Sequence, residues 1–386
     1  QPPDQQTGGE YDVEEQVLIK TTTPMRLQMP LAKAGIALLI FLCTDLPVCG
    51  QLKPALADSM LNFIQANRNK AALYITRNDT AIASLNENRR MPLASTVKII
   101  VAIEFARQSA RETINENAYI ALPELDKFYV PGTDGGAHSA WIDYARKNNE
   151  IRGDSVKLVD VARGMIIFSS NANTEYLMDL LGFDNVNNVL SQFDVKEHSV
   201  IFPLVGSLFL YQVPKKTSES KLAKTISGYS DKKYGLEAYE HHLGMKEDSG
   251  YRNRFRPEEF SLALQKIWSD RLPASTAKEY ALLVQSLNKR EVLEEPAYFT
   301  IAEVLEFPME NKIFQSVFKH YGVKGGSTGF VLTHVLYFTM KNGTRMELAI
   351  FFNDLTPEEE QKLEGWLDPF EAQVIFDPKF REKVKF

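Results

Sequence analysis

The stretch Met91-Pro-Leu-Ala-Ser-Thr-Val-Lys-Ile-Ile-Val-Ala-Ile-Glu-Phe-Ala106 places Ser95 and Lys98 at the start of a very apolar segment. Residues three apart share one face of a helix, so the Lys98 amine can reach the Ser95 hydroxyl. From position 97 to 106 only Lys98 and Glu104 are polar, and a helix that is apolar nearly all round is buried. Burial disfavours the ammonium form, so we expect a lowered pKa for Lys98. The stretch therefore predicts a nucleophilic serine beside a basic lysine on a buried helix.

The pattern Ser-x-x-Lys is unspecific on its own, because it recurs elsewhere in the chain. Two further copies lie in a polar run rich in lysine and serine, and Ser275 is predicted to cap the helix that follows it, with Lys278 on the solvent face. Only Ser95 begins a predicted buried helix, so the surrounding sequence selects this copy. The other copies are Ser218/Lys221, Ser230/Lys233, Ser275/Lys278, Ser286/Lys289 and Ser316/Lys319.

The composition is that of an ordinary globular protein. The 386 residues are 44% hydrophobic and 24% charged, which allows one large domain or two interleaved ones and argues against disorder. The net charge of −6 at pH 7 gives no indication of a nucleic-acid partner.

The N-terminal region is typical of an exported protein. Met25-Arg26 and Lys33 precede an apolar run that ends at Cys43, and Pro47-Val-Cys-Gly50 offers small residues for cleavage before Gln51. Residues 25–50 are therefore predicted to be a signal peptide, and residues 1–24 a non-native or untranslated leader. The apolar run is too short for a membrane span, so we expect no stable membrane insertion after cleavage. The predicted location is the periplasm or the exterior of a bacterium.

The positions of the two cysteines limit the chemistry that is available to the mature chain. Cys43 and Cys49 both fall within the predicted signal peptide, which leaves no thiol for a disulfide or a metal site. A lipid-modified Cys49 is less expected than ordinary cleavage, because Val48 is bulky for such a site. We expect neither a cofactor nor a metal.

Hydrophobic periodicity predicts an α+β fold with an antiparallel sheet built from both chain ends and an inserted helical region. Sheet elements are expected at about 51–90 and 320–386, and helices at about 91–319, within one catalytic domain from 51 to 386. The predicted elements are a helix over 56–66, a hairpin of 71–76 and 81–85, helices over 156–168, 172–181, 257–269 and 275–287, a hairpin of 331–340 and 344–353, and a helix after Pro357. The stretch 129–138 is predicted to be a loop that either lines a cleft or has no role, and 213–250 to be a polar surface loop.

Two later motifs complete a constellation with Ser95. Ser169-x-Asn171 lies at a turn between two predicted helices, and Val323-Lys-Gly-Gly-Ser-Thr-Gly329 opens a predicted strand pair. The order Ser-x-x-Lys, Ser-x-Asn, Lys-x-Gly resembles that of the serine β-lactamase and penicillin-binding protein superfamily, and most of all the class A β-lactamases. The resemblance covers nearly all of the chain from position 51 onward. It implies a small-molecule β-lactam or peptidoglycan-like substrate, and we expect a monomer.

The resemblance implies a role for each matching residue. Ser95 would be the acylated nucleophile and Lys98 its base, and Ser169 would pass a proton to the departing nitrogen. Asn171 and Lys324 would bind the substrate. Gly326 would be part of the substrate-binding strand. The backbone N–H groups of Ser95 and Ser327 would form the oxyanion hole.

Two departures from the family pattern affect the expected function. Gly325 follows Lys324 where the family usually carries a hydroxyl residue for the substrate carboxylate, and Ser327 could replace it. The Glu-x-x-x-Asn loop that supplies the deacylating base in class A enzymes does not occur between Asn171 and Lys324. Glu197, Glu237 and Glu240 lie in the right interval, without a reason to choose among them.

Other interpretations of the same residues stay open. The same site could belong to a D-alanyl-D-alanine carboxypeptidase, to an esterase, or to a covalent penicillin-binding sensor without turnover. The stretch 325–329 also matches the Gly-x-Ser-x-Gly elbow of α/β-hydrolases, but that elbow requires a helix after Ser327, where the sequence predicts a strand. Glu240-His241-His242 is predicted to be a solvated surface cluster rather than a metal site.

Overall fold

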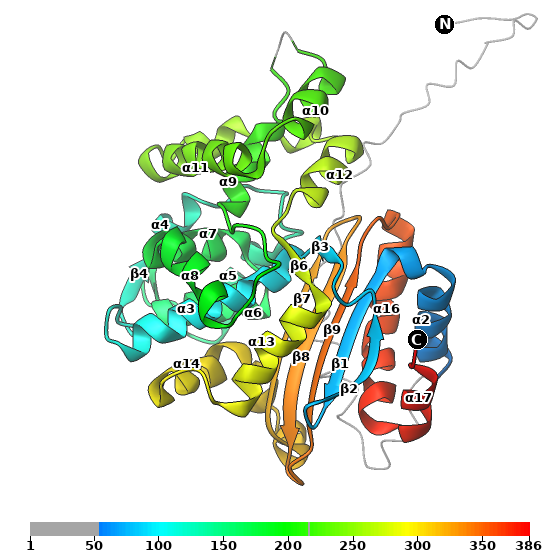
Figure 1. Cartoon of the computed structure of the whole chain (residues 1–386). Coiled ribbons are helices and arrows are strands. Elements are labelled where there is room, and N and C mark those ends of the chain that lie inside the picture. The colour runs from blue at the N-terminus through cyan, green and yellow to red at the C-terminus, as the bar shows by residue number, and fades with distance from the viewer. Residues whose placement is uncertain (1–53, 215–216) are drawn as a thin grey trace, which may run out of the picture.

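The computed structural model describes residues 54–214 and 217–386, so the predicted leader and signal peptide lie outside the described residues. Its centre is a five-stranded antiparallel sheet in the order β2-β1-β9-β8-β7 (Figure 1). Strand β1 from near the N-terminus pairs with β9 from near the C-terminus, which confirms the α+β fold with a sheet built from both ends. The strands are β1 (Ala71–Arg77), β2 (Thr80–Leu85), β7 (Phe318–Ser327), β8 (Leu332–Met340) and β9 (Arg345–Phe352).

Both faces of the sheet are covered by helices, and β8 and β9 are accordingly buried along almost their whole length. Helices α2 (Pro54–Ala66), α16 (Pro357–Phe376) and α17 (Pro378–Lys383) lie on one side, and α13 (Ala277–Lys289) lies on the other (Figure 1). Helix α16 begins with a capping box, in which Thr356 and Glu359 exchange hydrogen bonds with each other's backbone N–H groups.

The helical region is organised around α3 (Lys98–Ala110), which packs against α6, α7, α8 and α14 and is buried on nearly every side. The short strands β3 (Arg90–Pro92) and β6 (Ala274–Thr276) pair with each other, as do β4 (Tyr119–Ala121) and β5 (Ser155–Lys157). The other α-helices are α4 (Leu122–Asp126), α5 (Ala137–Lys147), α6 (Leu158–Ile167), α7 (Asn171–Leu181), α8 (Phe183–Gln192), α9 (Leu204–Leu208), α10 (Glu219–Ser227), α11 (Asp231–Glu247), α12 (Leu262–Asp270), α14 (Glu295–Leu305) and α15 (Lys312–Val317). The 3₁₀ turns are η2 (Arg68–Lys70), η3 (Ala94–Val97), η4 (Phe209–Tyr211), η5 (Tyr251–Arg254), η6 (Pro257–Glu259) and η7 (Phe307–Glu310).

The polar stretch 213–250 is not the loop that the sequence predicted. Apart from positions 215 and 216, which are outside the described residues, it contains α10 and the long helix α11. Each of these helices begins at a serine from another Ser-x-x-Lys copy. Ser218 accepts a hydrogen bond from the backbone N–H of Lys221, and Ser230 accepts one from Lys233. In both copies the spacing serves helix capping rather than a side-chain contact between serine and lysine.

Three further predictions are corrected at helix starts. The helix predicted over 257–269 begins only at Leu262, because residues 257–259 form the separate 3₁₀ turn η6. The helix predicted over 156–168 begins only at Leu158, because residues 155–157 form β5 and pair with β4. Ser275 does not cap the following helix, since it lies in β6 opposite Met91 and donates instead to the Glu279 carboxylate. Thr276 is the cap and accepts from the backbone N–H of Glu279. None of the described helices is long and apolar enough to span a membrane.

Candidate active site

Four side chains from three separate segments meet around the Lys98 amine. Lys98 Nζ lies 3.0 Å from Ser95 Oγ, 3.1 Å from Ser169 Oγ and 2.8 Å from Asn171 Oδ1. Lys324 Nζ donates to the same Ser169 Oγ at 3.1 Å. The nucleophile candidate is thus joined to two amines and a second hydroxyl through one continuous chain of hydrogen bonds.

Local backbone conformation positions the two serines. Ala94, which precedes Ser95 in η3, has φ +45°, and Ser169 has φ +67°, both in the left-handed region that most side chains avoid. Such conformations persist only where the surrounding structure imposes them, and they concentrate at functional sites. At Ser169 the next residue supplies this constraint, because the Ser170 side chain caps α7 by accepting from Asn173 N and contacts His138 Nδ1 at 2.9 Å.

The close approach of β7 to the nucleophile depends on Gly326. A Cβ atom built on Gly326 would lie 2.4 Å from the backbone nitrogen of Ser95 and 2.8 Å from that of Thr96. Both neighbours are backbone atoms, which cannot rotate away. Only glycine therefore lets the edge strand run directly against η3, with Ser327 next to it at the strand end.

Burial controls the charge of the two lysines. The Lys98 side chain is fully buried, which lowers its pKa well below the ordinary value, and the nearby Lys324 charge lowers it further, while Asp134 opposes the shift. Burial likewise lowers the pKa of Lys324 to about 7. The lowered pKa that the sequence predicted for Lys98 is present, and it favours the neutral amine relative to an exposed lysine.

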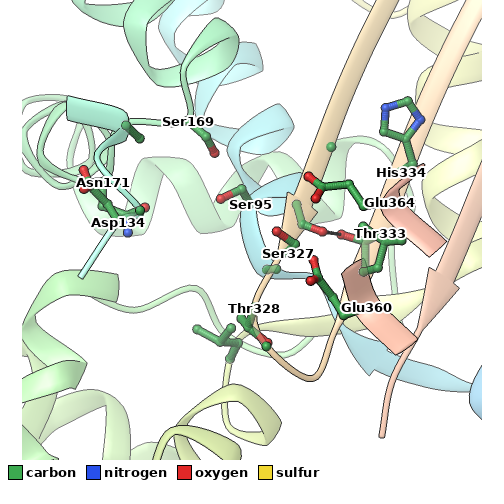
Figure 2. Close-up of a pocket in the computed structure, with 18 of the residues that line it drawn as sticks. Ser95, Asp134, Ser169, Asn171, Ser327, Thr328, Thr333, His334, Glu360 and Glu364 are labelled. Carbon is green, nitrogen blue, oxygen red and sulfur yellow. Dashed lines mark hydrogen bonds between the residues drawn. The ribbon is translucent and has the colours of Figure 1, made fainter. Parts of the chain in front are cut away.

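These residues open into a cavity of about 500 Å³ between the helical region and the sheet edge. Figure 2 shows Ser95 between two groups of side chains: Ser169, Asn171 and Asp134 on one side, and Ser327 and Glu360 on the other. Leu204, Leu208, Leu262, Trp268 and Leu272 supply apolar lining. The cavity thus offers an apolar wall with polar groups around Ser95, as expected for a small-molecule site.

Every residue that the sequence assigned to the site lines this cavity or touches its hydrogen-bond network. Ser95, Ser169, Asn171, Lys324, Gly326 and Ser327 are all in the lining. Lys98 lies behind them and donates to four of their oxygens, including the Ser169 carbonyl oxygen at 2.7 Å. Four residues of the loop predicted at 129–138 also face the cavity, namely Thr133, Asp134, Gly135 and Ala137, so this loop lines the cleft.

The glutamates considered for deacylation lie elsewhere. Glu237 and Glu240 border a separate surface hollow with Ser230 and Lys233. The backbone N–H of Glu197 donates a hydrogen bond to the Glu279 carboxylate. None of the three is among the residues that line the cavity. A base in the position expected for class A enzymes is therefore not supplied by these residues.

The two competing site interpretations do not match the structure. The chain after Ser327 enters β8 rather than a helix, so the α/β-hydrolase elbow is absent here. His242 is not solvated as predicted, because it is fully buried and hydrogen-bonds Glu175 and Asp179, each at 3.1 Å. Among the described residues no group of histidine, cysteine and acidic side chains is placed to hold a metal ion.

Sequence reasoning did not identify the groups contributed by α16 or the buried histidine behind Ser170. Glu358, Glu360 and Glu364 of α16 line the cavity beside β7, together with His334 of β8. Their sequence signal was weak, since acidic residues in a first helical turn, such as Glu358 and Glu360, are ordinary, and no motif marks Glu364 or His334. His138 lay in a predicted loop, and its contact with Ser170 is not visible in any local pattern.

The fold and the site together are those of a serine β-lactamase-like hydrolase, in which a buried lysine and a Ser-x-Asn turn surround one serine. The model of the β-lactamase enzyme family matches residues 55–364, and the chain belongs to this family. A search of curated proteins finds no match.

Solved structures of similar fold include β-lactamases and a penicillin-binding protein. A β-lactamase from Sphaerobacter thermophilus is 17% identical with a TM-score of 0.52, and the match covers 83% of this chain and 96% of that one. The extended-spectrum β-lactamase TLA-3 is 15% identical (TM-score 0.48, 83% and 99% covered). The L158E mutant of PBP-A, an acyl-enzyme complex with penicillin G, is also 15% identical (TM-score 0.47, 84% and 98% covered). At these identities the likeness concerns the fold alone.

Proposed function

We propose that this chain is an exported serine hydrolase that opens β-lactam rings through an acyl-enzyme at Ser95. The observation that carries the proposal is the 3.0 Å contact between Lys98 Nζ and Ser95 Oγ, inside a network that also holds Ser169 and Lys324. A nucleophile within hydrogen-bond reach of a desolvated base, at the wall of a small-molecule cavity, is the arrangement that acyl transfer needs.

In the proposed reaction each group moves a proton or stabilises a charge. The neutral Lys98 amine takes the proton from Ser95 as its oxygen attacks the amide carbonyl, and the oxyanion forms against the backbone N–H groups of Ser95 and Ser327. Ser169 then passes a proton to the departing ring nitrogen. Lys324 holds positive charge beside Ser169, and Asn171 binds the amide group of the substrate.

A second candidate function, acylation with slow release, is favoured by the position of Glu197, Glu237 and Glu240, none of which lines the cavity. The carboxylates among the described lining residues are Asp134 on one side and Glu358, Glu360 and Glu364 on the other. The Asp134 carboxylate already accepts backbone N–H groups of Gly136 and His138. A penicillin-binding enzyme or sensor would need only the acylation half of the site, and a carboxypeptidase or esterase would apply it to an unstrained substrate.

The test follows both adduct and turnover. Purified protein is incubated with benzylpenicillin and with a chromogenic cephalosporin, and intact mass and hydrolysis are recorded together. We expect one adduct per chain that maps to Ser95 and disappears in Ser95→Ala. Ser218→Ala, which alters a Ser-x-x-Lys copy that only caps α10, should keep the adduct. An adduct that persists in Ser95→Ala or maps to Ser327 would refute the assignment.

Export and a monomeric state are expected from the sequence alone, and both are part of the proposal. We expect cleavage of residues 25–50 on secretion, with Gln51 as the new N-terminus, and a monomer afterwards. Expression in a bacterium, N-terminal sequencing of the secreted chain and light scattering check these points. Lipid attached at Cys49 would show the less expected route instead.

A further inference from the structure

The end of the cavity next to β7 is acidic. Glu360 and Glu364 are four residues apart on α16, so their side chains share one face of the helix, and both line the cavity. Figure 2 shows Glu360 beneath Ser327 and Glu364 on the same side, between Ser95 and His334. The exposed Glu358 adds a third carboxylate at the rim.

Glu360 is the unusual member of this group. Its side chain is only 1% exposed, yet its Oε1 atom has no hydrogen-bond partner among the described residues. A buried carboxylate without a donor is costly, and proteins normally pair it. Burial and the neighbouring Glu364 charge raise the pKa of Glu360 to about 8, while a hydrogen bond from Ser327 works in the opposite direction.

The basic groups that line the cavity do not supply the missing donor. Lys324 Nζ is directed to Ser169 Oγ and to the Gly325 carbonyl oxygen, and His334 Nδ1 is paired with Glu371. Because its pKa is raised to about 8, Glu360 is largely protonated at neutral pH while the cavity is empty, and no basic side chain among the described lining residues favours its carboxylate form. A positively charged nitrogen placed beside Glu360 would favour the carboxylate and supply the hydrogen-bond donor that its Oε1 atom lacks.

We propose that Glu360, together with Glu364, forms a subsite for a protonated nitrogen of the substrate, in place of the carboxylate that Lys-x-Gly strands of this superfamily are expected to bind. The inference rests on the proposed acylation at Ser95 and specifies its substrate class: cyclic or linear amides that carry an ammonium or amidinium group on the side facing Ser327. Ser327, which hydrogen-bonds Glu360 and follows the glycine in contact with Ser95, connects the subsite to the nucleophile.

The experiment compares three forms of one cephalosporin: the free ring carboxylate, its methyl amide, and its 2-aminoethyl amide. Second-order rate constants for the Ser95 adduct are measured by intact mass for the wild-type chain, Glu360→Gln and the control Glu358→Gln. We expect the aminoethyl amide to acylate the wild-type chain at least about tenfold faster than the methyl amide, the size of one charge-assisted hydrogen bond. This preference should vanish in Glu360→Gln and persist in Glu358→Gln.

The outcomes separate this inference from the proposed function. Equal acylation rates for all three forms, or the highest rate for the free carboxylate, would overturn the subsite while leaving Ser95 acylation intact. A preference for the aminoethyl amide that survives in a folded Glu360→Gln variant would do the same. The wild-type comparison decides the matter even if that variant does not fold. No adduct with any form would overturn the acylation and the subsite together.

Discussion

Lys98 and Lys324 donate to the same Ser169 hydroxyl oxygen, each at 3.1 Å, and burial lowers the pKa of both amines. Their proposed tasks are opposite. Lys98 must be neutral to accept the Ser95 proton, whereas Lys324 must be charged to hold the leaving group and the substrate. Both tasks can be performed at one pH only if Lys98 loses its proton at a lower pH than Lys324 does.

This pair predicts a bell-shaped pH dependence of Ser95 acylation. The rate should rise as Lys98 loses its proton and fall as the pH passes the Lys324 pKa of about 7. In Lys324→Arg the guanidinium stays charged, so the alkaline fall should move above pH 10. Stopped-flow acylation with benzylpenicillin from pH 5 to 10 measures both limbs. An unchanged alkaline limb in Lys324→Arg would show that another group causes it.

Among contacts between elements, strand β7 and the turn η3 approach each other through their backbone atoms. Gly326→Ala should push β7 away from η3, since its Cβ would lie 2.4 Å from Ser95 N. We expect the acylation rate to fall by about two orders of magnitude or more, the usual cost of misaligned oxyanion donors. Gly329→Ala is the matched control, because its nearest neighbour is 4.0 Å away. Equal rates in both variants would contradict this account.

A second inter-element contact joins α11 to α7. Burial alone would lower the pKa of His242, but its hydrogen bonds with Asp179 and Glu175 raise it to about 9. Glu175 also accepts the backbone N–H groups of Val205 and Gly206 in α9, so one buried carboxylate connects three helices. These contacts hold the helical segment that carries Leu204 and Leu208 against the cavity.

His242→Gln should therefore destabilise the fold in a pH-dependent manner. Because the folded-state pKa lies above the unfolded value of about 6.5, the stabilisation is complete below pH 6.5 and is lost as the pH rises through about 9. We expect a loss of about 3–5 kcal/mol at pH 6, typical for a broken buried ion pair, and a smaller loss at pH 10. Urea unfolding at both pH values measures it. His241→Gln is the control, since the pKa of His241 is lowered by burial and its pH dependence has the opposite sign.

At the scale of the whole molecule, the groups proposed for acylation line the cavity or, in the case of Lys98, contact its lining from behind, whereas Glu197, Glu237 and Glu240 do not line it. We therefore predict a stoichiometric burst of acylation followed by slow turnover, the kinetic sign of an accumulating acyl-enzyme. Rapid mixing with a chromogenic cephalosporin, with the adduct followed by mass, measures the two phases. Steady turnover without a burst, abolished in Asp134→Asn, would identify Asp134 as an efficient deacylating base and refute the expectation of slow release.

The sequence by itself determined the fold class and the groups that chemistry requires. The spacing of Ser95 and Lys98, the apolar helix behind them, the Ser169-x-Asn171 turn and the Asn-Gly hairpin between β8 and β9 are all local patterns. Local patterns are readable because residues three or four apart meet on a helix and residues two apart share a strand face. The order of the three motifs then pointed to one superfamily.

The tertiary structure alone decided what surrounds these groups. Spacing could not separate Ser95 from Ser218 or Ser230, because capping a helix and contacting a lysine amine use the same interval. Nor could it bring Glu360 beside Ser327, since that proximity depends on how α16 packs on the sheet. Burial, which lowers the Lys98 pKa and raises that of Glu360, is a property of the packed molecule and not of any short segment.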